Sequence, residues 1–599
     1  MLISLDSKAS KHGDVIGTYL GDNPLSNNHV SAIQEWFIHC LDNHADCCKR
    51  ASGEEHFNAR NVPLPSRCLD IKDPANIRVK ETRGERGAYV ALSHRWGAET
   101  ATCRTTTENV ESRKQSLDAA ILPRMFRDVI RFTQLLGIQY LWIDSLCIVQ
   151  DGDDGEDWKH EALLMGQYYQ YSLITIAVAT PPNDPAGCFP PRPSGLNGML
   201  ARLPYIDQQG RKDGFVYVQE RHGSVHDEYR NTILQSELLG RGWVLQEWLL
   251  SRRLIFITSN QLYFECQSKW PHNEYMETAH LGLDAGRISG RIHSEWIVPL
   301  KSLFSYKTKP IGDLWCTIVE TYCTLQLTKP ELDTFLAIAG IAGEIKRMIA
   351  QEATNGDATN KQREYYVAGL WLTDIHHGLL WEQRTRLNTI GSNPRAPTWS
   401  WASQSTPIKW QPRGKRVANT CEICALILPD GRSFDLNDTT EYENGSEDPG
   451  GVFGVTNSFA ALKILSQRRL FLIHRHLTSS ETTKISSYTG NATNFAGTWR
   501  AVSDPLSPTR HLGWASIESP SVSRQLGEEN SIALQALHIA RIRGESGGVK
   551  FGKLGMTHSV CCVVFIIPRE DGRYERVGTG RIFQSQYFDG VQKEEVELV

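Results

Sequence analysis

The sequence predicts an α/β domain in which the strands of a parallel sheet alternate with helices. An apolar run at residues 141–143 ends abruptly at Asp144, which is typical of a buried strand with a polar site at its end. The preceding segment, Leu122–Leu136, repeats its apolar residues at the spacing of one helical face, with Pro123 suited to its first turn and Gly137 to its end. A helix that returns directly to a strand is half of a βαβ unit, so helices are expected to cover a parallel sheet.

Two further apolar runs are predicted to be strands of the same sheet. One covers residues 89–92 and leads into a polar turn, and the other covers Leu173–Ala179 and ends at two prolines. Helical patterns separate the strands, a weaker one over Glu108–Ser116 and a stronger one over Trp158–Tyr169. Since consecutive strands of a sheet are usually neighbours, the three strands are expected to lie parallel and adjacent, or nearly so.

Polar residues follow the predicted strands at the points where a parallel sheet binds its ligands, the carboxyl ends of its strands. Ser93 and Asp144 end two strands, Cys147 lies in the loop after Asp144, and Glu161 lies in the next helix. These side chains are expected to approach a common rim. Three more residues are expected to line the same pocket: Trp96, Gln150 and Trp158.

Changes of pattern along the 599 residues suggest four regions, because the chain exceeds the usual size of one hydrophobic core. An N-terminal extension covers 1–80, the α/β domain covers 81–270, a helical region covers 271–360 and a largely β accessory region covers 361–599. A Pro/Gly-rich insert is expected within the α/β domain, from residue 183 to about 236. The strands expected in the last region are Tyr366–Leu372, Cys421–Leu428, Leu534–Ile542 and Ser559–Ile567.

The charge of the chain argues against nucleic acid and membrane partners. A net charge of −4 and the absence of a long Lys/Arg run leave no broad basic field for a polyanion. The first twenty residues lack the basic start and apolar core of a signal peptide, and no run of about eighteen apolar residues occurs. A cytoplasmic protein is therefore expected.

The 14 cysteines are scattered along the chain, which is unlike a secreted disulfide scaffold. Cys40, His44, Cys47 and Cys48 form one crowded group, with Cys68 further on. Structural zinc sites normally show two cleanly spaced pairs of ligands, so no metal site is predicted.

Three blocks of sequence together resemble the fungal heterokaryon-incompatibility (HET) domain. The blocks are Tyr89–Gly97, Leu141–Gln150 and Arg241–Arg253, and they follow the family's order over roughly residues 85–270. The third block carries four motif residues: Arg241, Trp243, Gln246 and Glu247. The resemblance implies a role in non-self recognition and programmed cell death, and a flavodoxin-like parallel sheet similar to that of TIR domains.

Some TIR domains cleave NAD⁺ with a glutamate on a helix that follows a tryptophan, so the resemblance also implies a chemistry. Glu161 follows Trp158 by three residues and is the catalytic candidate, with NAD⁺ as substrate. Its carboxylate would stabilise an oxocarbenium-like transition state, as carboxylates do in glycoside cleavage. The spacing in TIR domains is usually four, and one residue turns a helical side chain by about 100°.

Other functions and structural roles stay open at this point. A non-enzymatic TIR-like domain would assemble with itself or with another incompatibility protein and recruit a death effector. A Cys-dependent hydrolase would use Cys147 as nucleophile, although no nucleophile elbow surrounds it. Asp144 either lines the pocket or caps the following turn, and Glu247 either lines the pocket or pairs with Arg241 in a buried network.

Overall fold

The computed structural model describes residues 2–4, 18–21, 23–50, 52, 56–181, 187–189, 200–207, 209–219, 223–276, 278–279, 301, 310–355, 365–384, 396–411, 413, 417–428, 430–436, 461–475, 499–542, 559–583 and 585–599. The chain divides into two compact units. The first comprises Met1–Ile311, Leu325–Leu327 and Leu336–Met348, and the second comprises Gly312–Thr324, Thr328–Phe335 and Ile349–Val599.

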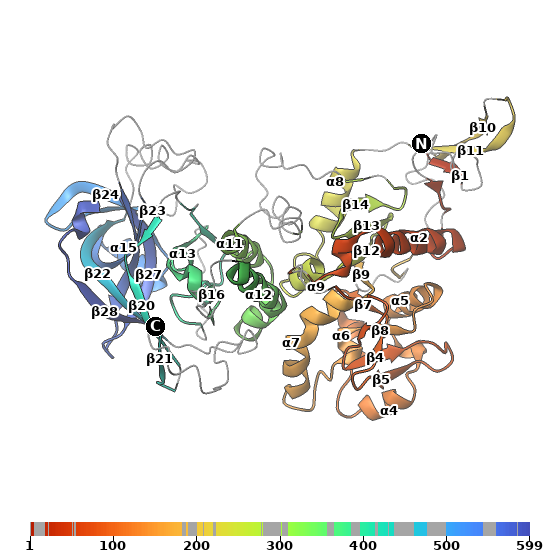
Figure 1. The fold of residues 1–599 in the computed structure, drawn as a ribbon, viewed down its shortest axis with the longest axis horizontal. Coiled ribbons are helices and arrows are strands. Elements are labelled where there is room, and N and C mark those ends of the chain that lie inside the picture. Colours follow the sequence, from red (N-terminus) through yellow and green to blue (C-terminus); the bar gives the residue numbers. More distant parts are fainter. Residues whose placement is uncertain are drawn as a thin grey trace. The chain divides into compact units, whose positions relative to one another are not determined.

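Four parallel strands form the centre of the sheet in the first unit (Figure 1). Their spatial order is β8 (Tyr140–Trp142), β7 (Tyr89–Ser93), β9 (Ile174–Val178) and β12 (Arg253–Ile257), and each pairs in parallel with the next. The prediction that the strands near 89, 140 and 173 are parallel neighbours is confirmed. Numbered along the chain, the four strands stand in the order 2-1-3-4.

Antiparallel strands extend the sheet on both sides, so the sheet of the first unit is mixed. β4 (Arg67–Asp70) and β5 (Arg78–Glu81) follow β8, while β13 (Leu262–Cys266) and β14 (Lys269–Asn273) follow β12. Short loops join β4 to β5, β12 to β13 and β13 to β14, and a short loop can only join antiparallel neighbours. The predicted parallel sheet is therefore correct for the central strands and wrong for the edges.

Helices cover both faces of this sheet. α5 (Arg124–Leu135) connects β7 to β8, and α7 (Glu156–Tyr171) connects β8 to β9 on the other side of β7, so right-handed crossovers put them on opposite faces (Figure 1). α9 (Val244–Leu250) precedes β12 and contacts α7. Shorter helices in the loops are α3 (Ala98–Thr102), α4 (Val110–Gln115) and α6 (Asp144–Cys147).

The N-terminal extension packs on the sheet through α2 (Asn27–Asn43). Its apolar face buries Val30, Ile33 and Phe37, and the Trp36 ring stacks on Phe264 of β13 with centroids 5.0 Å apart. A 3-10 helix, η1 (Ala45–Cys48), follows directly. Two short strands, β3 (Val62–Pro63) and β6 (Arg86–Gly87), pair with each other.

The predicted Pro/Gly-rich insert contains strands and a helix that its composition did not indicate. Within the described residues it holds the hairpin β10 (Leu200–Ile206) and β11 (Lys212–Gln219), which forms a sheet with β1 (Leu2–Ser4) and β2 (Thr18–Tyr19). α8 (Val225–Tyr229) follows and continues into a π-helical turn over Arg230–Leu234.

The second unit contains the largely β region that the sequence predicts. Its main sheet closes into a ring, because β22 pairs with β25 as well as with β23. The strands of the ring are β22 (Ala461–His474), β23 (Trp499–Asp504), β24 (Ser507–Ile517), β27 (Tyr574–Ile582), β26 (Val560–Pro568) and β25 (Ser531–Ile542). Attached elements are β19 (Val417–Asn419), β20 (Glu422–Ile427), β21 (Ser433–Asp435), β28 (Lys593–Leu598) and α15 (Pro520–Glu528).

Helices and two hairpins precede this ring. α11 (Ile311–Tyr322) and α12 (Pro330–Asn355) lie where the helical pattern was expected. The strand predicted at 366–372 is instead a hairpin of β15 (Tyr366–Val367) and β16 (Leu370–Trp371), because Ala368 and Gly369 turn the chain with positive φ angles of 44° and 91°. The other elements are β17 (Trp381–Gln383), β18 (Ile408–Trp410) and α13 (Ile375–Gly378).

Candidate functional site

A polar cluster lies at the carboxyl ends of β7 and β8, at the rim where the sequence predicts a site. Asp144 follows β8 with its side chain 25% exposed, and its Oδ2 accepts a hydrogen bond of 2.8 Å from the Trp96 indole. Its Oδ1 accepts one of 2.7 Å from the backbone N–H of Ser145. Asp144 therefore fixes the turn after β8, as the capping alternative expected, while part of its carboxylate still reaches solvent.

Glu247 is the buried acid of this cluster. It lies in α9, is 5% exposed, and has a pKa raised to about 7 because burial disfavours its charged form. The nearby Ser93 hydroxyl and the positive charge of Arg241 oppose this rise, whereas the negative charge of Asp144 adds to it. Ser93 and Asp144 are thus close enough to influence the protonation of Glu247.

Arg241 and His94 complete the cluster. The Arg241 guanidinium donates a 2.8 Å hydrogen bond to the carbonyl of His94. The His94 ring is buried against Phe126, and its Nδ1 lies 3.8 Å from Oδ1 of Asp144. Burial lowers the pKa of His94, so its ring is neutral at neutral pH, and its Nε2 has no hydrogen-bond partner among the described residues.

Glu161, the residue chosen as catalytic from the sequence, belongs to a different set of contacts. It is 2% exposed and accepts a 2.7 Å hydrogen bond from the hydroxyl of Tyr168 on its own helix. Tyr168 also contacts the Ser66 hydroxyl at 3.0 Å, and the positive charge of Arg67 acts on Glu161. Glu161 lies on the side of α7 next to the start of β4. It does not belong to the group of Ser93, Asp144 and Glu247.

Residues 89–247 match the family model of the heterokaryon incompatibility protein (HET). The chain carries a HET domain. The matched segment begins with the first residue of β7 and ends at Glu247, so it contains Ser93, Asp144 and the acid of α9. No curated protein and no solved structure matches the chain.

Two other predicted pocket residues, and two of the motif residues, have packing and positioning contacts. Gln150 donates from its side chain to the carbonyl of Asp144 at 3.1 Å, which holds the loop after β8. Trp158 and Trp243 meet edge to face with ring centroids 5.9 Å apart, half-buried against the core. Gln246 accepts a 3.3 Å hydrogen bond from the backbone N–H of Gly340.

Cys147 is unsuited to act as a nucleophile in the HET domain. It is 1% exposed, and burial raises the pKa of its thiol to about 12, so the reactive thiolate is scarce at neutral pH. Its backbone carbonyl accepts a 2.7 Å hydrogen bond from Arg67. These contacts make Cys147 part of the core beneath the rim.

Glu247 is the main functional candidate of this site, although the sequence favoured a structural role for it. A signal for it exists in the sequence, because Glu247 follows Trp243 by four residues, whereas Glu161 follows Trp158 by three. Tyr169 was not predicted as a neighbour of the site, whereas His94 stands within the first motif block. The hydroxyl of Tyr169 approaches Glu247 and donates a 3.0 Å hydrogen bond to the carbonyl of Leu92.

No helix among the described residues has both the length and the apolar composition required to cross a bilayer.

Proposed function

We propose that this HET-domain protein acts in fungal non-self recognition and programmed cell death, and that its HET domain cleaves NAD⁺ with Glu247 as the catalytic carboxylate. One observation carries the chemical part of the proposal. Glu247 is a buried glutamate four residues after a tryptophan, at the carboxyl rim of a parallel sheet, with Ser93, Asp144 and Arg241 as neighbours.

The order of the central strands supports a TIR-like assignment. The flavodoxin-like order is 2-1-3-4-5, and the four parallel strands here have the order 2-1-3-4. Glu247 lies on the helix between the third and fourth of these strands, β9 and β12, whereas Glu161 lies on the helix after the second, β8. The spacing of four from Trp243 is the one that the resemblance to NAD⁺-cleaving TIR domains implies.

The proposed reaction is hydrolysis of the bond between nicotinamide and ribose. As this bond breaks, its electron pair leaves with nicotinamide, and positive charge develops on the ribose. A carboxylate in a site of low dielectric stabilises that charge. Water then adds to the ribose carbon and loses a proton, which gives ADP-ribose.

Three neighbours of Glu247 are suited to hold such a substrate. The half-exposed Trp96 ring offers an apolar face for a base, and its indole is held in place by Asp144. Arg241 brings a guanidinium to the same rim, and guanidinium groups bind phosphate through paired hydrogen bonds. Ser93 contributes a hydroxyl next to the Glu247 carboxylate.

Nicotinamide release from NAD⁺ by the purified full-length chain tests the proposal, measured over a range of protein concentrations because assembly activates some signalling domains. Release by the unaltered chain and loss of roughly a hundredfold or more in Glu247→Gln are the expected results. The substitution keeps the size of the side chain and removes its charge. Toxicity in cells without nicotinamide release or NAD⁺ loss would overturn the chemistry and favour the non-enzymatic assembly domain.

A further inference from the structure

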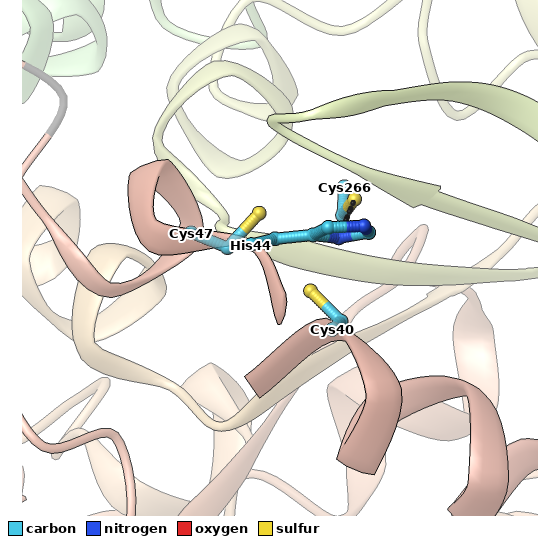
Figure 2. Close-up of side chains that lie close together, drawn as sticks. All are labelled: Cys40, His44, Cys47 and Cys266. Carbon is cyan, nitrogen blue, oxygen red and sulfur yellow. Dashed lines mark hydrogen bonds between the residues drawn. The ribbon is translucent and has the colours of Figure 1, made fainter. Parts of the chain in front are cut away.

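A second cluster lies away from the rim, where three cysteines and a histidine converge. Cys40 lies in the last turn of α2, His44 follows this helix, Cys47 lies in η1 and Cys266 ends β13. One sulfur or nitrogen atom from each of these residues lies within 4.8 Å of all the others. Figure 2 shows the three cysteine side chains gathered around the His44 ring.

We propose that Cys40, His44, Cys47 and Cys266 bind one structural Zn²⁺ ion. Three thiolates and one imidazole are a complete ligand set for tetrahedral zinc, and a set of four protein ligands is typical of structural rather than catalytic sites. Zinc bonds of about 2.3 Å to sulfur and 2.0 Å to nitrogen put tetrahedral ligand atoms roughly 3.5–3.8 Å apart. The Sγ of Cys266 is already 3.5 Å from Nδ1 of His44. The widest separation between ligand atoms, which is at most 4.8 Å, would have to shorten by about 1 Å on zinc binding.

The local backbone presents the first three ligands on one side. The N–H of His44 donates to the carbonyl of Cys40 at 3.1 Å, and the N–H of Cys47 donates to the carbonyl of His44 at 2.9 Å. These bonds close two consecutive turns, so residues four and three apart in sequence face the same way. Cys266 reaches them from a strand that is 222 residues away from His44 along the chain.

The surroundings of the cluster suit a site with net negative charge. Zn²⁺ with three thiolates carries a charge of about −1. Arg253 is fully buried beside the cluster and donates a 3.1 Å hydrogen bond to the carbonyl of Cys47. Arg252 donates at 2.5 Å to the carbonyl of Asp46 in the same turn. Two buried cations therefore lie beside the proposed site, where they would offset its net negative charge.

The geometry favours a metal site over apolar packing or a disulfide, which are the two other common states of buried cysteines. Packing as small hydrophobes does not require three sulfurs and an imidazole to meet at one point. A disulfide would join two sulfurs and leave the third sulfur and the histidine without a role, and all described cysteines are free. A bound zinc ion would tie α2 and η1 to the β12–β13 hairpin, so it would clamp the N-terminal extension onto the sheet.

Metal analysis of the purified full-length chain tests this proposal. The expected result is about one zinc per chain in the unaltered protein and a loss of roughly tenfold or more in Cys47→Ala and Cys266→Ala. Cys48→Ala is the matched control, because Cys48 neighbours the cluster without belonging to it, and this variant should keep its zinc. Equal loss of zinc in Cys48→Ala would overturn the assignment of the ligands.

Two further measurements keep the test decisive if an alanine variant fails to fold. Cys47→His retains four ligand side chains and should keep measurable zinc. Cobalt(II) supplied to the unaltered chain, after zinc removal, should give the intense visible bands of tetrahedral geometry and a sulfur-to-cobalt charge-transfer band, whereas zinc removal should lower the melting temperature by roughly 5 °C or more. A chain that binds neither metal, or that contains a disulfide between two of the three cysteines, would overturn the proposal.

Discussion

Two buried glutamates of the first unit stand in different environments, and the difference separates a candidate for chemistry from a structural residue. Glu161 accepts a hydrogen bond from Tyr168 and lies near the cation of Arg67, so its charge has partners within the protein. Glu247 has burial as the largest influence on its pKa, which rises to about 7, and its neighbour Asp144 reaches solvent. A buried carboxyl group that is costly to ionise and lies close to solvent is typical of a catalytic carboxylate.

The largest expected difference between the two glutamates is in the rate of NAD⁺ cleavage. Glu247→Gln should reduce nicotinamide release roughly a hundredfold or more, and Glu161→Gln should change it by about threefold or less if the variant folds. Rates are compared at equal concentrations of folded protein, which circular dichroism checks. The opposite ranking would return the catalytic role to Glu161, as the sequence first suggested.

The pH dependence of stability should also distinguish Glu247. The folded chain keeps the Glu247 proton up to about pH 7, whereas the unfolded chain releases it near the ordinary value of 4.5. The unfolded state therefore binds fewer protons between these values, and stability falls as pH rises through this range. Relative to the unaltered chain, Glu247→Gln should gain up to about 3 kcal/mol in unfolding free energy between pH 5 and pH 8. Unfolding of both proteins is measured at pH 5 and at pH 8. If their difference in unfolding free energy is the same at the two pH values, the raised pKa of Glu247 is contradicted.

The same ionisation predicts how activity depends on pH. A carboxylate that stabilises positive charge works only when ionised, so nicotinamide release should increase with pH and level off above about pH 7. The profile is measured as kcat/KM, which reports the pKa of the free protein. A rate that decreases through this range would indicate that Glu247 acts as a proton donor instead.

Removing the partner of Glu161 should affect stability more than catalysis. Tyr168→Phe deletes the hydroxyl that bonds both Glu161 and Ser66, and leaves a buried carboxylate with fewer donors. A loss of about 1–3 kcal/mol in unfolding free energy is expected, with nicotinamide release per folded molecule nearly unchanged. Denaturant unfolding of the two proteins measures the loss.

The smallest expected effect is at the exposed edge of the rim cluster. Trp96→Phe keeps an aromatic ring and removes the indole N–H that bonds Asp144. Because Asp144 is partly solvated, a loss of only about 1 kcal/mol or less is expected, together with a higher KM for NAD⁺. An unchanged KM would remove Trp96 from the proposed substrate pocket.

Patterns within single segments of the sequence predicted the central helices and strands of the first unit. The 3.6-residue period of α5 and the apolar runs of β7, β8 and β9 are properties of consecutive residues, and the parallel order of these strands followed from the helices between them. The antiparallel edge strands and the ring of β22 to β27 depend on pairing between distant segments. The polar and apolar residues of β22 do not show which of several strands it will join.

The sites show the same limit. Ser93 and Asp144 could be placed at a rim, because strand ends are visible in the sequence. Cys266 could not be grouped with His44, since only the folded sheet brings residues 222 positions apart together. Glu161 was preferred over Glu247 because it follows Trp158 on a predicted helix, while the burial that raises the pKa of Glu247 has no local signal.

The order of the sheet also determines where the HET domain can be cut. The segment that matches the family, 89–247, contains β7, β8 and β9 but neither β4 nor β12, which cover the outer edges of β8 and β9. A fragment with these ends would expose the backbone of two apolar strands, and such edges pair readily with other copies. A fragment from α2 to β14, residues 27–273, keeps both edges covered and retains the helix that packs on β13. A HET domain that is to be moved between proteins therefore has to be longer than the matched segment.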